Sequence, residues 1–190
     1  MLFAREAGPA TALGRWSKRL FSSLIFGGLF LLPFFAYLAA EPTPYRDPAG
    51  LFTITPPDGW VTDDSEHMGP GLVAKGPADA AGNEPLIHLM HEAAGIVPLE
   101  MRWQAILGQL RFDTERLKYL AIEEHPDATP PYAQAAYSYQ RGSQKFLALT
   151  RLVLAQGRFY LLTAAAPEGE FEPLQPALAA SFDSLHIGGK

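Results

Sequence analysis

Two histidines and a glutamate lie within five residues of one another, at His88, His91 and Glu92. Imidazole and carboxylate groups bind metals, but this order is not the HExxH pattern that places two histidines on one face of a helix. The stretch from Leu86 to Glu92 is typical of a β-strand, in which residues three apart point to opposite faces. One metal ion would not reach both imidazoles. We therefore predict no metal site and interpret the two histidines as partly exposed polar residues of a strand.

The serines and paired carboxylates lack the spacing that catalysis requires. Ser138, Ser143 and Ser181 are not flanked by a nucleophile-elbow pattern such as GxSxG. The adjacent pairs Glu123-Glu124 and Asp63-Asp64 do not bring two carboxylates together in a strand or loop, so no shared-proton dyad is expected. Glycine-rich phosphate-binding loops are also missing from the sequence. We predict no catalytic residue and no cofactor, and therefore a protein that is not an enzyme.

Several aromatic side chains favour a binding surface instead. Three tyrosines lie close together near several prolines, and a tryptophan follows a Pro-Pro-Asp-Gly turn and precedes an acidic segment. Aromatic residues beside an acidic surface are typical of protein interfaces. The candidate partner-binding surface consists of Trp60, His67, Tyr132, Tyr137 and Tyr139. In the alternative interpretation, Tyr137 and Tyr139 cover the core and keep their hydroxyls at its rim.

Charge is distributed unevenly along the 190 residues. Residues 1–40 carry four Lys and Arg against one Glu, whereas residues 41–190 carry 11 Lys and Arg against 19 Asp and Glu, a net charge of −8. An acidic body argues against nucleic acid as a partner, because the phosphates would repel it. The chain has no cysteine, which excludes disulfides and thiolate metal sites.

An uncharged apolar stretch runs from Leu20 to Ala40, directly after the basic residues Arg15, Lys18 and Arg19. About 20 helical residues cross the hydrocarbon core of a bilayer. The basic flank predicts that residues 1–19 stay in the cytoplasm and that the following chain is exported. Residues 20–40 are either a transmembrane anchor of a single-pass inner-membrane protein or the apolar region of a signal peptide cleaved after Ala40. A buried helix of a soluble fold fits the charge asymmetry less well.

The exported part begins with a proline-rich linker at residues 41–48, and a domain is expected at 49–190. Apolar stripes predict helices at Leu99–Arg111 and from Phe171 to Phe182. The stretch Thr62–Pro70 is expected to be irregular. Alternating patterns predict strands at residues 50–55, 72–75, 86–92, 117–124, 133–140, 144–155 and 158–166. The strand at 144–155 is apolar on both faces, which indicates a position inside a sheet that is covered on both sides. Short hairpin links predict an α+β class with a mostly antiparallel sheet of six or seven strands and two helices.

Two stretches resemble the PsbP-like group of extracytoplasmic domains, whose bacterial relatives include DcrB-type lipoproteins. GLFTITPPDGW, from Gly50 to Trp60, is similar to the family's aromatic strand, proline turn and tryptophan. Leu152 to Phe182 is similar to its closing hairpin, following loop and final helix. The resemblance covers about residues 48–187 and implies an αβα sandwich around an antiparallel sheet. It implies no shared catalytic set, and the photosystem role of PsbP itself does not transfer.

The sequence favours two functions over a third, a hydrolase whose site no motif encodes. The first is a non-catalytic module, tethered to the bilayer through Leu20 to Ala40, that binds or helps assemble an integral membrane protein complex from the periplasmic side. The second is a secreted or periplasmic carrier of a small molecule or lipid, held in a cavity between the sheet and the helices. Both place the domain outside the bacterial cytoplasm.

Overall fold

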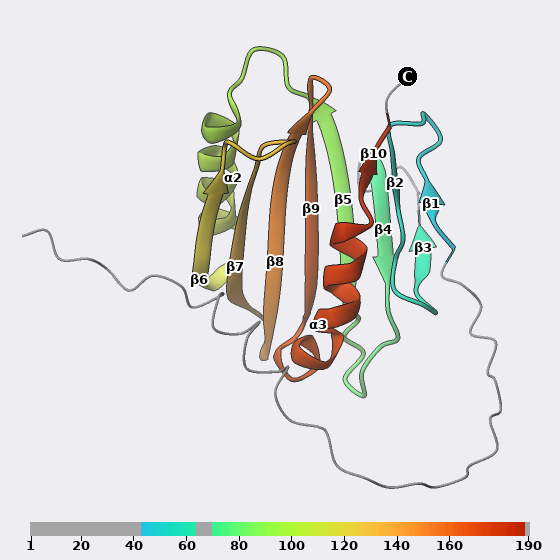
Figure 1. The fold of residues 1–190 in the computed structure, drawn as a ribbon. Helices are drawn as coiled ribbons and strands as arrows, with labels where there is room; N and C mark the ends of the chain where they lie inside the picture. The colour runs from blue at the N-terminus through green and yellow to red at the C-terminus, as the bar shows by residue number, and fades with distance from the viewer. Residues whose placement is uncertain (1–42, 64–69, 189–190) are drawn as a thin grey trace, which may run out of the picture. The chain divides into compact units, whose positions relative to one another are not determined.

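Seven antiparallel strands form the central sheet of the computed structural model, which describes residues 43–63 and 70–188 (Figure 1). The strand order is β3-β4-β5-β9-β8-β7-β6. The bounds are β3 Val61–Asp63, β4 Gly71–Lys75, β5 Leu86–Ala93, β6 Glu115–His125, β7 Tyr132–Arg141, β8 Gln144–Ala155 and β9 Arg158–Pro167. Each link between β6 and β9 is a hairpin, so these four long strands lie side by side in chain order, and β5 pairs with the far edge of β9.

Two helices cover opposite faces of this sheet (Figure 1). The helix α2, Leu99–Asp113, packs on β6, β7 and β8, and the helix α3, Glu168–Asp183, packs on β8 and β9. Side chains alternate along a strand, so Phe159 joins the core under α2 whereas its neighbour Tyr160 joins the core under α3. The prediction that β8 is covered on both sides is therefore confirmed, as is the α+β class.

The apolar stripes of the two helices are the surfaces that meet the sheet. In α2 the buried side chains are Trp103, Ile106 and Leu107. In α3 they are Leu178, Ser181 and Phe182, although this helix contains two prolines. Each proline removes a backbone donor from the helix. Packing of the apolar stripe against the sheet compensates for that loss, because burying one large apolar side chain stabilises by roughly 1.5–3 kcal/mol.

A second, smaller sheet corrects the prediction for the start of the domain. It has the order β1-β2-β10, with bounds β1 Tyr45–Arg46, β2 Phe52–Ile54 and β10 His186–Ile187. The strand predicted at 50–55 therefore belongs to this sheet and not to the central one. Its buried side chains pack into the core under α3. The predicted linker at 41–48 already contains β1, and the segment predicted to be irregular from residue 62 begins within β3, because both short strands pair with distant partners.

The predicted apolar segment Leu20–Ala40 lies outside the described residues, as does His67. Within the described ranges, no helix combines the length and the apolar character that crossing a bilayer requires.

Candidate functional site

One face of the sheet is only partly covered by its helix. On that face α3 packs on β8 and β9, and Figure 1 shows no helix in front of β6 and β7. The strand registers place eleven side chains on this side of β6, β7 and β8. We call this surface the open face; its residues are Lys118, Ala121, Glu123, His125, Tyr132, Gln134, Ala136, Ser138, Leu147, Leu149 and Arg151. Most of them are half-buried.

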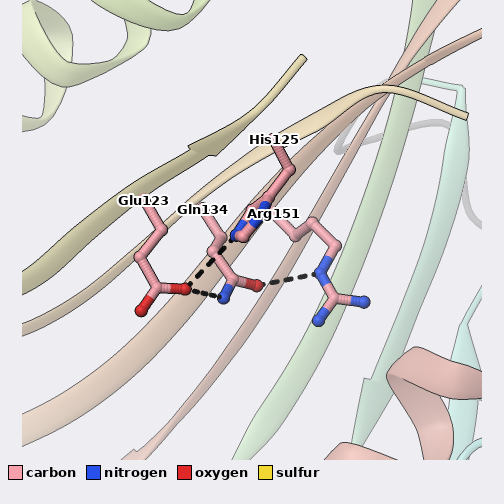
Figure 2. Close-up of polar contacts among 4 residues, drawn as sticks. All are labelled: Glu123, His125, Gln134 and Arg151. Carbon is pink, nitrogen blue, oxygen red and sulfur yellow. Dashed lines mark hydrogen bonds and ion pairs between the residues drawn. The ribbon is translucent and has the colours of Figure 1, made fainter. Parts of the chain in front are cut away.

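Three polar side chains form a ladder across the open face. Glu123, Gln134 and Arg151 lie directly opposite one another on β6, β7 and β8. Gln134 Nε2 donates a hydrogen bond of 2.7 Å to Glu123 Oε2, and Arg151 Nε donates one of 3.1 Å to Gln134 Oε1 (Figure 2). The amide of Gln134 therefore has one orientation, with its nitrogen towards the carboxylate and its oxygen towards the guanidinium. We refer to these three residues as the polar ladder.

Aromatic rings pack around the arginine end of the polar ladder. The guanidinium carbon of Arg151 lies 5.1 Å from the ring centroid of Tyr132 and 5.4 Å from that of Phe182 in α3. The ring of His125 stacks on Tyr132 at 4.5 Å between centroids, and its Nε2 lies 3.5 Å from Glu123 Oε2. A cation close to an aromatic ring is stabilised by roughly 0.5–2 kcal/mol, more where water is excluded. The guanidinium is therefore held in place by ring contacts as well as by a hydrogen bond.

The side chains of the open face are of mixed chemical character. Among the described residues there is no cluster of three or more His, Cys, Asp or Glu able to hold a metal ion. The polar ladder contains one cation, one anion and one amide, flanked by the half-buried apolar side chains Leu147 and Leu149. Arginine and tyrosine in such surroundings are the residue types that dominate binding energy at protein interfaces.

The structure does not bring the described members of the predicted partner-binding surface, Trp60, Tyr132, Tyr137 and Tyr139, into one patch. Tyr132 belongs to the open face. Tyr137 is only 4% exposed and lies with the half-buried Tyr139 on the opposite face, under α2. The parity of the strand explains this, because residues five apart point to opposite sides. The interpretation that Tyr137 and Tyr139 cover the core fits their positions, but the Tyr137 hydroxyl is bonded inside the core and not at its rim.

Trp60 lies away from the open face and is partly buried against the core under α3. Its ring lies against Gly76, where an added methyl group would meet the ring at 2.8 Å. The tryptophan also lines a polar hollow of about 410 Å³ beside β1 and the Pro56-to-Thr62 turn. The contacts of Trp60 are therefore mainly packing contacts within the domain.

The two histidines of the HxxH stretch point to opposite faces, as predicted. His88 lies opposite Thr163 on the side of α2, and burial lowers its pKa. His91 lies on the side of α3, where its Nδ1 is 2.9 Å from Arg158 Nη2. Burial lowers the pKa of His91 most, the charge of Arg158 lowers it further, and Asp47 opposes both. At neutral pH this imidazole therefore accepts the hydrogen bond from Arg158.

The polar ladder was not predicted from the sequence. In the sequence, Glu123 stands out only as a neighbour of Glu124. The two carboxylates separate as predicted, since Glu124 accepts a 3.5 Å hydrogen bond from Gln104 of α2 on the other face. The sequence does mark Arg151 as a candidate site residue, because it is the one charged residue between Phe146 and Gln156 in a mainly apolar strand.

A separate hollow lies between α2 and the sheet. It has a volume of about 270 Å³ and a mainly apolar lining that includes Met90, Ile106, Phe159 and Leu161. At its edge Arg102 Nε and Glu92 Oε1 form a 2.5 Å ion pair between α2 and β5. The hollow is slightly smaller than the ~300–1,000 Å³ typical of small-molecule sites.

Comparisons with known proteins identify the fold. No protein-family model and no curated protein matches the chain. Among solved structures, LpqN of Mycobacterium tuberculosis, described as involved in cell envelope biogenesis, aligns with a TM-score of 0.58 and 19% identity over 77% of this chain and 90% of its own. PsbP (CyanoP) of the cyanobacterium Synechocystis aligns with a TM-score of 0.55 and 14% identity over 76% and 91%.

A third structure, a Pseudomonas aeruginosa protein of unknown function described as a putative regulator, aligns with a TM-score of 0.54 and 14% identity over 78% of this chain and 98% of its own. At these identities the likeness concerns the fold. The chain therefore has a PsbP-like fold, and the resemblance predicted from Gly50–Trp60 and Leu152–Phe182 is confirmed at that level.

Proposed function

We propose that this protein is a non-catalytic, extracytoplasmic accessory module that binds a protein component of a membrane complex through its open face. The observation that carries the proposal is the polar ladder, which extends from Arg151 beside α3 to the part of the sheet, β6 and β7, that α3 leaves uncovered. The polar ladder joins three strands and presents an arginine, and Tyr132 and half-buried leucines lie beside it. These features match the core of a protein interface, where a few Arg and Tyr side chains supply most of the binding energy.

The placement outside the cytoplasm rests on the N-terminal charge pattern. The basic residues before Leu20–Ala40 favour export of everything that follows. The acidic body is consistent with a protein partner and not with nucleic acid. The similar structures add support of a general kind, since one of them is described as acting in cell envelope biogenesis.

Site-specific photo-crosslinking in cells tests this function. A photoreactive p-benzoylphenylalanine replaces Leu147 on the open face, and in a matched control it replaces Gln109, which is exposed on α2 on the other side of the sheet. We expect Leu147 to capture one integral membrane protein in stoichiometric amounts and Gln109 to capture none. The proposal is contradicted if both positions capture the same amount of membrane protein. It is also contradicted if Leu147 captures no protein when the complex is purified from solubilised membranes.

A second function, a carrier of a small apolar molecule, is favoured by the hollow between α2 and the sheet. Native mass spectrometry of the protein purified from membranes would detect a bound compound. Ile106→Trp fills the hollow from the side of α2, so loss of the compound in this variant supports the carrier function. Failure to find any bound mass in the unmodified protein counts against it.

A further inference from the structure

The guanidinium of Arg151 has hydrogen-bond donors that do not take part in the polar ladder. Its Nε donates a hydrogen bond to Gln134 Oε1, whereas its terminal nitrogens Nη1 and Nη2 form no hydrogen bond with the described residues. Figure 2 shows these two nitrogens directed away from the polar ladder. The edge of the guanidinium formed by Nη1 and Nη2 therefore remains available to a ligand on the open face.

The position of that edge is fixed before any ligand arrives. Gln134 cannot turn its amide without giving up its 2.7 Å bond to Glu123, so the acceptor for Arg151 Nε is constant. The rings of Tyr132 and Phe182 pack on the guanidinium, and Phe182 is itself 3% exposed and belongs to the core. A side chain that is already ordered loses little conformational freedom when it binds.

The geometry of the free edge selects the class of ligand. Two parallel N–H groups match the two oxygens of a carboxylate or of a phosphate, and each N–H···O⁻ bond is charge-assisted. Glu123 lies two strands away in the same ladder, and residues 41–190 carry a net charge of −8. These negative charges oppose a phosphate dianion more strongly than a carboxylate monoanion. The surroundings thus favour the carboxylate.

We propose that Arg151 is a carboxylate-binding site that receives an Asp, Glu or C-terminal carboxylate of the protein partner. Gln134 and Glu123 act as positioning residues, because they orient the guanidinium and do not touch the ligand. This proposal rests on the proposed function for the identity of the ligand's carrier, but the binding chemistry of the site can be tested without any partner.

The test is an NMR titration of the full chain in a non-ionic detergent with acetate, and separately with inorganic phosphate, at constant ionic strength. The signals followed are the Arg151 Nε–H and the Gln134 side-chain amide. We expect a saturable shift with acetate, and binding at least about tenfold weaker in Arg151→Lys, which keeps the charge but loses the fork. Arg141→Lys, at the exposed end of β7, should leave the titration unchanged.

A second variant separates the site from a folding defect. Gln134→Leu keeps Arg151 and removes only its acceptor, so we expect weaker acetate binding with the remaining backbone spectrum intact. The proposal is overturned if acetate gives no saturable shift, if Arg151→Lys binds acetate as well as the unmodified chain, or if phosphate binds more tightly than acetate. Acetate binding without any crosslinked partner at Leu147 would leave the site in place and refute only the proposed function.

Discussion

The hydroxyl of Tyr137 lies 3.1 Å from Thr150 Oγ1 in the core beneath α2, and Thr150 Oγ1 lies 3.0 Å from Thr163 Oγ1. These three side chains form a row of hydroxyls across β7, β8 and β9. Tyr137 and Thr150 are 4% and 1% exposed, so water does not substitute for these bonds. Burial raises the pKa of Tyr137 to about 12, and its hydrogen bond to Thr150 opposes part of that shift. The phenol therefore stays neutral at physiological pH.

The first prediction concerns alkaline pH. The folded pKa of Tyr137 is about 12, whereas a free tyrosine titrates near 10, so the folded state holds this proton more tightly than the unfolded state. The resulting stability is fully present below pH 10 and is lost as the pH rises towards 12. We expect the free energy of unfolding to fall by roughly 1–3 kcal/mol more in the unmodified protein than in Tyr137→Phe across this range. Urea titrations at several pH values measure this, and parallel curves for the two proteins would contradict it.

The second prediction concerns the centre of the hydroxyl row. Thr150→Val keeps the shape of the side chain but leaves the Tyr137 hydroxyl without its partner inside the core. A buried polar group that loses its partner destabilises by about 1–3 kcal/mol. Thr163→Val is the matched control, because Thr163 is half-buried and ends the row, and it should cost less. Denaturant unfolding gives both values, and an equal or larger loss at Thr163 would show that the row is not organised around Thr150.

The long elements were predictable because their apolar periodicity is strong over many residues. In β8, alternate side chains enter the cores on the two sides of the sheet. Each of the helices α2 and α3 has one apolar stripe that extends over three turns and packs into one of these cores. The strands β1 and β10 have two residues each, and the three residues of β3 show no apolar alternation, so none of the three was predictable. Their formation depends on pairing with distant strands, as in the register of Ile187 with Phe52.

The candidate site depends on how three strands align with one another, which is difficult to predict from the sequence. The three residues of the polar ladder, Glu123, Gln134 and Arg151, lie at the same level on three neighbouring strands. The lengths of the β6–β7 and β7–β8 turns set this level, because the register runs without a shift from each turn to the ladder. No local pattern encodes that alignment. The separation of Tyr132 from Tyr137 was readable, however, since an odd spacing within one strand places two side chains on opposite faces.

A third prediction concerns His91. Burial and the nearby Arg158 charge both lower its pKa, and Asp47 raises it. We expect the pKa of His91 to rise in Arg158→Gln, because one of the two lowering causes is removed while Asp47 remains. His88, whose pKa is lowered by burial alone, is an internal control and should not change. NMR titration of the imidazole protons reads both histidines in one sample.

The same histidine predicts a loss of stability in acid. Its folded pKa lies below the ordinary value of 6.5, so the unfolded state binds this proton more readily. The associated stability is present above pH 6.5 and falls as the pH drops below it. In unfolding experiments below pH 6.5, the free energy of unfolding should therefore fall more steeply in the unmodified protein than in His91→Asn. An unchanged His91 pKa in Arg158→Gln would show that the 2.9 Å contact has no electrostatic consequence.

The last prediction compares two glycines. Gly71, at the start of β4, has a φ of 154°, and a Cβ added there would lie 1.9 Å from the carbonyl oxygen of Leu89 on the neighbouring strand. Backbone atoms cannot yield as a side chain does, so Gly71→Ala should destabilise the protein by at least ~2 kcal/mol. Gly108, inside α2, has open space within 4 Å of the position that a methyl group would take, and Gly108→Ala should stabilise by up to ~1 kcal/mol through helix propensity. Thermal unfolding distinguishes the two, and a tolerated alanine at Gly71 would mean that β4 and β5 do not approach each other as closely as their register indicates.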